Sequence, residues 1–211
     1  KANILPYETI RSIIESDYKM PINQVFKEFQ RQPLGSASVS QVHKAVTFDG
    51  KVVAVKVKRP NVEQHLTSDI RIMKFFALLG MTCSRTLRKF QLYGVVVFFE
   101  AWIRQDIDFR LEAKNIKIFR EQELSNSSEK YKVFCMDIVD ELCTDNVVVM
   151  DFVEGIPVSK KKELFENKEY DIYKTIETYM NAIIKNWFRD DISEFFFQAD
   201  PHLSNIIALP N

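Results

Sequence analysis

Three clusters of residues have types and spacings that could do chemistry on a phosphate-bearing ligand. The first is the small-residue segment 33–43, PLGSASVSQVH, which ends where an extended stretch begins. Gly35, Ser36, Ala37 and Ser38 would let backbone N–H groups approach a phosphate closely. The segment matches neither the GxxxxGKS/T nor the GxGxxG pattern, so an ordinary small-residue turn is the alternative interpretation.

The second cluster is Val53-Ala54-Val55-Lys56, a lysine at the end of an apolar run. An ammonium group that loses hydration is costly unless it is paired, so Lys56 predicts a partner carboxylate or a bound anion. The pattern is that of the lysine-bearing third strand of protein kinases. The alternative is an edge-strand lysine that reaches solvent.

The third cluster, Ala199-Asp200-Pro201-His202-Leu203-Ser204-Asn205, follows a long predicted helix. Asp200 and Asn205 are five residues apart, the spacing of the catalytic Asp and the metal-binding Asn in a kinase catalytic loop. Asp200 and His202 as metal co-ligands, or a plain capped turn, are the alternatives.

A carboxylate group lies between these clusters, on the predicted helical stretch 93–123. Asp108 and Glu112 are four residues apart and share one helix face, with Asp106 close by. Solvated helix surface is the default interpretation of such charges. One of these carboxylates could instead be the partner that Lys56 requires.

The elements that must position these residues follow from the hydrophobic pattern. Ser38–Val46 and Lys51–Lys58 alternate in polarity around Asp49-Gly50, which predicts a β-hairpin. Pro33 is expected to end helical structure before this hairpin. Helices are predicted at 6–15, 22–29, 61–81, 93–123 (broken once) and 171–189, and strands at 131–138 and 146–153. A loop is predicted at 125–129, and a strand with a loop over 195–208. Gly155 and Pro157 are expected to end the second of these strands. The order predicts an α+β fold of two lobes that meet near residues 153–157.

Composition narrows the functional class. The chain has 211 residues, 46% of them apolar, which is enough for a real core. The 29 basic and 29 acidic residues give no electrostatic argument for binding nucleic acid.

The three widely spaced cysteines predict a reducing, intracellular compartment and buried thiols. No segment has the apolar length of a membrane span, and no targeting peptide is visible. The aromatic stretch Phe90–Trp102 predicts core packing, or a face for a membrane or a partner.

Five motifs, in order along the chain, resemble those of the UbiB/aarF-domain-containing family of atypical kinase-like proteins. They are 33–45 (family pattern PLAAASIxQVHxA), 53–60 (VAVKVQRP), 106–115 (ELDFRxEAxN), 148–155 (LxMExVxG) and 198–206 (HADPHPGNI). The resemblance implies a protein-kinase-like bilobal fold. Its N-lobe, residues 1–153, would hold a small antiparallel sheet with extra helices, and residues 154–211 would begin a helical C-lobe.

The resemblance also implies roles for individual residues. Lys56 would hold ATP phosphates and pair with Glu112, beside the loop Gly35–Ser38. Asp106 and Asp108 would lie near the nucleotide and metal, while Met150, Asp151 and Val153 would form the hinge against adenine. Asp200 would be the catalytic-loop acid, and Asn205 a Mg²⁺ ligand. ATP and Mg²⁺ are the implied cofactors, with membrane lipids or quinone-pathway proteins as partners.

The sequence also departs from the family pattern at several positions. The family's KxGQ and DFG motifs are expected outside residues 1–211, Asp106 replaces Glu, and Gln198 replaces His. Leu203-Ser204 replaces Pro-Gly, and Gly35-Ser36 makes the phosphate loop less alanine-rich. We therefore expect little or no catalysis from this chain alone.

Three functions follow from the sequence. The first is an ATPase or atypical kinase that supports prenylquinone (coenzyme Q type) or related lipid metabolism, membrane-associated, and in mitochondria or plastids if the source is eukaryotic. The second is a nucleotide-binding pseudokinase that regulates a lipid-pathway partner. The third is a lipid- or protein-binding module that no longer uses nucleotide.

Overall fold

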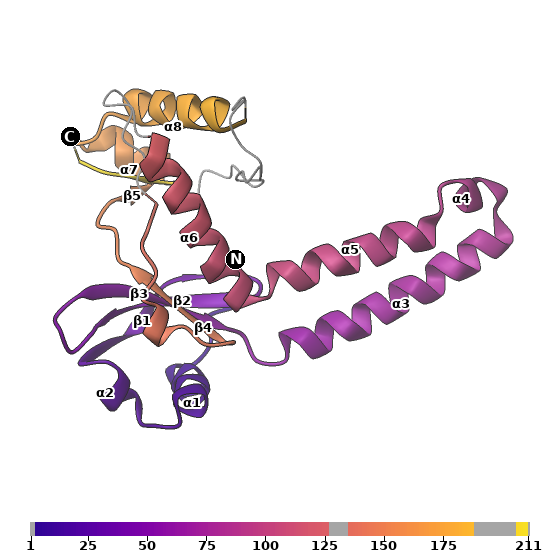
Figure 1. The fold of residues 1–211 in the computed structure, drawn as a ribbon, viewed down its shortest axis with the longest axis horizontal. Helices are drawn as coiled ribbons and strands as arrows, with labels where there is room; N and C mark the ends of the chain where they lie inside the picture. The colour runs from indigo at the N-terminus through magenta and orange to yellow at the C-terminus, as the bar shows by residue number, and fades with distance from the viewer. Residues whose placement is uncertain (1–2, 127–134, 188–205, 211) are drawn as a thin grey trace. The chain divides into compact units, whose positions relative to one another are not determined.

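The computed structural model describes residues 3–126, 135–187 and 206–210 (Figure 1). The chain divides into two compact units, one formed by residues 1–114 and 138–150, the other by 115–137 and 151–211. The lobe boundary at residue 153 stays a prediction.

A four-stranded sheet in the order β1-β2-β3-β4 organises the first unit. The strands are β1 (Glu28–Ser36), β2 (Ser40–Val46), β3 (Val52–Lys58) and β4 (Val147–Asp151), the last ending at the unit boundary. β1 with β2 and β2 with β3 pair antiparallel. Helices α1 (Tyr7–Tyr18) and α2 (Ile22–Val25) cover one face of the sheet (Figure 1).

The predicted β-hairpin is confirmed as β2 and β3. Gly50 has φ of 88°, a conformation that L-residues rarely adopt, and it closes the turn between the strands. Along β3 the side chains alternate between faces, so Val53, Val55 and Val57 enter the core with α1 and α2. Lys56 therefore stands on the opposite face of the sheet.

Strand β1 corrects two predictions. The helix expected at 22–29 ends at Val25, and Pro33 lies within a strand instead of ending helical structure. β1 is the edge of the sheet, where a residue without an N–H is tolerated. Its register with β2 shifts on both sides of Pro33.

The remaining helices of the first unit follow β3 along the chain. They are α3 (Val62–Cys83), α4 (Arg85–Lys89), α5 (Leu92–Asp106) and the start of α6 (Phe109–Asn126), with a 3₁₀ turn at Asp140–Leu142. The break expected within 93–123 falls at Ile107-Asp108. Within the described ranges, no helix has both the length and the apolar character needed to cross a bilayer.

The second unit combines a two-stranded sheet with two helices. Its elements beyond α6 are β5 (Ile156–Pro157), β6 (Ile207–Ala208), α7 (Lys161–Glu166) and α8 (Ile172–Trp187). Ile156, Val158, Leu164, Ile172 and Ala208 form its core. Pro157, expected to end a strand, instead belongs to β5.

Only residues 135–138 of the strand predicted at 131–138 are described by the structure. Residues 135–137 form no strand, and Ile138 makes a single bridge to Met150. Residues 131–134 lie outside the described residues, as do those from 195 to 205 within the predicted strand-and-loop segment.

Candidate functional site

An ion pair between β3 and α6 is the centre of the candidate site. Nζ of Lys56 donates to both carboxylate oxygens of Glu112, at 2.6 and 2.7 Å. The two side chains keep 20% and 27% of their surface exposed, so the pair is half-buried but within reach of a solute. An ammonium has three N–H donors, and this bidentate contact uses two of them. One donor therefore remains for an anion.

An aromatic ring supports this pair. Nζ of Lys56 stands 4.9 Å from the ring centroid of Phe109, and Nζ of Lys58 stands 5.0 Å from it. Phe109 is 1% exposed, so its ring is a fixed surface. A cation over an aromatic face is attracted by the ring quadrupole. Phe109 thus holds both ammonium groups on the outer face of β3.

Two contacts set the start of α6, and with it the position of Glu112. Oδ1 of Asp108 accepts from the backbone N–H of Leu111 at 3.0 Å, which caps the helix N-terminus. Arg110 donates to Oδ1 of Asp145 and to the carbonyl oxygen of Cys143, both at 3.0 Å. The observed contact of Asp108 is therefore structural, although its side chain remains exposed.

The small-residue loop between β1 and β2 is held by a residue that the sequence did not single out. Arg59 donates from Nε to the carbonyl oxygen of Ala37 at 2.8 Å and from Nη2 to Oγ of Ser36 at 2.6 Å. Its backbone N–H also bonds the carbonyl oxygen of Val39 at 2.9 Å. Ser38 lies exposed at the turn. The loop is thus fixed in shape while its tip stays accessible.

Gly35 is not required there by its backbone conformation. It pairs with Val42 in the sheet, its φ is not positive, and a Cβ at this position would meet no atom within 4 Å. Any close approach of the backbone to a phosphate would therefore depend on the turn at 37–39. There the N–H of Ala37 is already donated to the carbonyl oxygen of Ser40.

The Gln41 and His43 side chains of the same motif are buried and bond to protein groups. Nδ1 of His43 is 2.8 Å from the carbonyl oxygen of Gln30, and Nε2 is 3.0 Å from Nε2 of Gln41. A carbonyl can only accept, so Nδ1 carries the proton and Nε2 accepts from the amide. Burial lowers the pKa of His43, and its bond to the Gln30 carbonyl opposes this only in part.

The same amide ties down the segment before α1. Oε1 of Gln41 accepts from the N–H of Leu5 at 2.8 Å, while Nε2 donates to its carbonyl oxygen at 3.3 Å. Arg59 also bonds the carbonyl oxygen of Asn3. The QVH residues of the phosphate-loop motif therefore brace the loop and its neighbours.

The other predicted site residues are less informative. Met150 is buried in β4, whereas Asp106 is exposed at the end of α5. In the second unit, the N–H of Asp151 donates to the carbonyl oxygen of Asp137, and Val153 is half-buried. Asp200 and Asn205, the predicted acid and metal ligand, lie outside the described residues. Across 3–126, 135–187 and 206–210, no three His, Cys, Asp or Glu side chains gather as a metal site.

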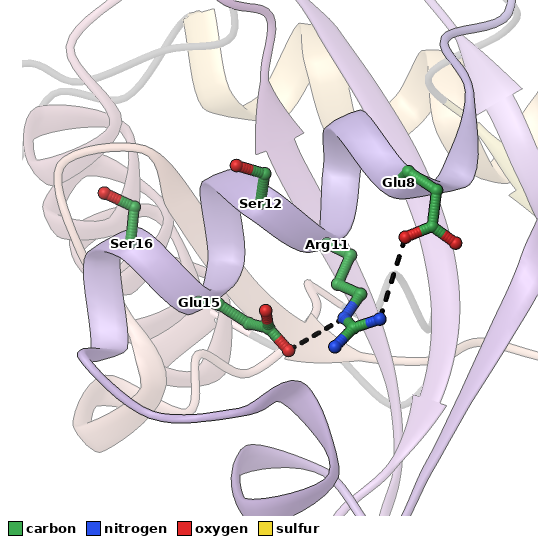
Figure 2. A pocket seen from close by; sticks show the side chains of 5 residues that line it. All are labelled: Glu8, Arg11, Ser12, Glu15 and Ser16. Carbon is green, nitrogen blue, oxygen red and sulfur yellow. Dashed lines mark hydrogen bonds and ion pairs between the residues drawn. The ribbon is translucent and has the colours of Figure 1, made fainter.

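A shallow hollow on α1 does not compete with this site. It is lined only by Glu8, Arg11, Ser12, Glu15 and Ser16 (Figure 2). Arg11 pairs with Glu15 at 2.9 Å and with Glu8 at 3.7 Å along the same helix. Its charges thus stabilise α1.

The family follows from the whole sequence. The model of the ABC1 atypical kinase-like domain matches residues 1–211. The chain belongs to this ABC1 atypical kinase-like family. The resemblance to UbiB- and aarF-type proteins is thereby confirmed, and with it a kinase-like enzyme family in general.

Individual ABC1 relatives are similar over nearly the whole chain. A Pseudomonas aeruginosa protein named "Probable protein kinase UbiB" is 33% identical over 96% of this chain and 36% of its own length. The Xenopus laevis "AarF domain-containing protein kinase 1" is 28% identical over 100% of this chain and 38% of its own. An uncharacterised Clostridium pasteurianum protein is 30% identical over 96% of this chain and 36% of its own. The chain thus spans little more than a third of these relatives.

A solved structure supports the fold. Rv3197 of Mycobacterium tuberculosis, determined in complex with erythromycin, matches with a TM-score of 0.65 and 21% identity. The match covers 96% of this chain and 48% of that one. Together with the ABC1 match, it confirms the predicted α+β, kinase-like fold.

Proposed function

We propose that this chain is the nucleotide-binding part of an ATP-dependent atypical kinase or ATPase. The observation that carries the proposal is the bidentate pair of Lys56 and Glu112 on the outer face of β3. In protein kinases this pair positions the lysine on the nucleotide phosphates. Here the lysine has one N–H left for a phosphate oxygen, and solvent can reach it.

The roles of the remaining residues follow from this placement. The turn at Ala37–Val39 would face the phosphates, with Ser38 nearest because the Ala37 N–H is already bonded. Met150, Asp151 and Val153 would line the adenine side as the hinge. Asp200 would orient an acceptor hydroxyl. The implied cofactor is ATP with Mg²⁺, which would neutralise charge on the transferred group, with Asn205 as a ligand and Asp106 and Asp108 nearby.

For the parent protein we propose a role in prenylquinone or related lipid metabolism. The name UbiB among the relatives supports this role. Such a role would place the protein at bacterial, mitochondrial or plastid membranes. A pseudokinase that regulates a lipid-pathway partner is the competing outcome of the tests below.

The test is stabilisation by nucleotide. ATP with Mg²⁺ should raise the melting temperature of the chain, since a ligand that binds only the folded state stabilises it. Lys56→Met should abolish this shift. The control Lys162→Met, on α7 with a side chain 89% exposed, should keep it. An equal shift in wild type and Lys56→Met would refute the proposal.

Turnover separates an enzyme from a pseudokinase. We expect little or no phosphate release from this chain alone. ATP hydrolysis that Asp200→Ala abolishes would contradict that expectation. Stabilisation by ATP without phosphate release in a full-length relative would favour the pseudokinase.

A further inference from the structure

Helices α3 and α5 form a hairpin joined by α4, here called the α3–α5 hairpin (Figure 1). Ile70 and Ala77 of α3 and Val96 of α5 are its buried apolar side chains. Helical residues advance by about 100° each, so Ile70 and Ala77 share one face. Phe75, Phe76 and Leu79 lie about half a turn away from that face.

These outward faces are apolar on both helices. The large exposed side chains include Phe75, Phe76, Leu78, Leu79, Phe98 and Trp102. Val95, Phe98 and Trp102 follow the i, i+3, i+7 spacing of a stripe along α5. Phe75 is 62% exposed and Phe98 is 76% exposed. A groove on a protein partner would cover one face, whereas two outward apolar faces suit immersion in an apolar phase.

Charge in the outer part of the hairpin, residues 70–99, has one sign. Residues 70–99 contain five Lys and Arg and no Asp or Glu, which leaves 24 basic and 29 acidic residues elsewhere. Lys74 pairs with Glu100, just beyond this range. Among the described residues, no carboxylate pairs with Arg71, Arg85 or Lys89. An otherwise slightly acidic chain thus concentrates unneutralised positive charge beside its exposed aromatics.

We propose that the α3–α5 hairpin lies along the interface of a bilayer that contains anionic lipids, with the exposed apolar side chains of α3 and α5 buried in it. Basic residues are attracted to such a surface, and the apolar face of an interfacial helix is buried about 5–10 Å into the headgroup and acyl boundary. The vesicle experiment contains no nucleotide, so its failure is distinguishable from a failure of the nucleotide binding proposed above.

The experiment is co-sedimentation of the chain with vesicles. One set is phosphatidylcholine alone, and the other is equal parts phosphatidylcholine and phosphatidylglycerol. Binding should require phosphatidylglycerol and weaken as salt is added. Combining Phe75→Ser with Phe98→Ser should weaken binding by more than about tenfold, because two large apolar side chains would no longer leave water on binding.

A matched control tests whether vesicle binding is specific to the surface of the α3–α5 hairpin. Phe48, in the turn between β2 and β3, is 62% exposed, as is Phe75. Phe48→Ser should bind vesicles like wild type. The chain has two tryptophans, so Trp187→Phe leaves Trp102 as the sole reporter. Brominated acyl chains should quench its fluorescence.

Several results would overturn the proposal. One is that the chain does not bind anionic vesicles. Another is that the Phe75/Phe98 double variant binds them as well as wild type does. A third is that Phe48→Ser weakens vesicle binding as much as the double variant does. A dimer in light scattering that the double variant dissociates, without vesicle binding, would assign the surface to a second copy of the chain. Circular dichroism of each variant checks that the helices remain folded.

Discussion

Removing either partner of the Lys56–Glu112 pair should destabilise the chain more than removing both. Breaking a buried ion pair costs about 3–5 kcal/mol because one charge is left uncompensated. Exposed pairs contribute about 0–1 kcal/mol. With 20% and 27% of the two side chains exposed, we expect a coupling between these limits, about 1–3 kcal/mol.

The measurement is a double-mutant cycle of Lys56→Met, Glu112→Gln and the combined variant, with urea unfolding followed by circular dichroism. Lys56→Met alone leaves the carboxylate facing an apolar chain, whereas Glu112→Gln leaves the ammonium on the Phe109 ring and an amide. Glu112→Gln should therefore be the milder single change. A coupling below about 0.5 kcal/mol, the usual error of additivity, would show that solvent screens the pair and would refute this reasoning.

Three further predictions concern the loop, the core and the second unit. Gly155→Ala should destabilise by about 1–3 kcal/mol, because its Cβ would stand 2.3 Å from the carbonyl oxygen of Ala208. Gly35→Ala, where a Cβ meets nothing, should instead stabilise by about 0.5–1 kcal/mol, and urea unfolding of both checks the contrast. Because burial lowers the pKa of His43, the unfolded chain binds its proton first, and stability should fall as pH drops below about 6.5. His43→Gln should flatten that slope between pH 5 and 7 in pH-dependent unfolding, and an unchanged slope would contradict the assignment. Arg59→Lys cannot make the same forked contacts with Ala37 and Ser36, so it should speed proteolysis at the loop and weaken any nucleotide-induced stabilisation, both without change in Lys162→Met.

The β-hairpin could be predicted because local and tertiary signals agree there. β3 alternates in polarity, and Asp49-Gly50 supplies the turn. Strand β1 could not be predicted in this way, because Pro33 and Gly35 both disfavour a strand interior. Only its position at the sheet edge, which is not visible in the local sequence, makes Pro33 acceptable.

The candidate site divides in the same way. Lys56 could be found because a charge inside an apolar strand demands a partner, and the family motif indicated Glu112. Arg59 was missed because two of its three side-chain acceptors, on Ala37 and Asn3, are backbone carbonyls, which every residue carries. Phe109 was missed because a buried aromatic ordinarily indicates core packing, and its cation contact depends on how α6 crosses β3.

The alternation along β3 has a consequence for how this family can diverge. Val53, Val55 and Val57 are 0% exposed and maintain the core, while Lys56, the proposed phosphate-binding residue, stands on the opposite face. Replacing an ion pair jointly with apolar residues is often neutral for stability. Selection could therefore discard the lysine and its glutamate together without unfolding the strand. Family members with and without kinase activity can therefore share one fold. The presence or absence of the Lys56–Glu112 pair, more than overall sequence similarity, would distinguish them.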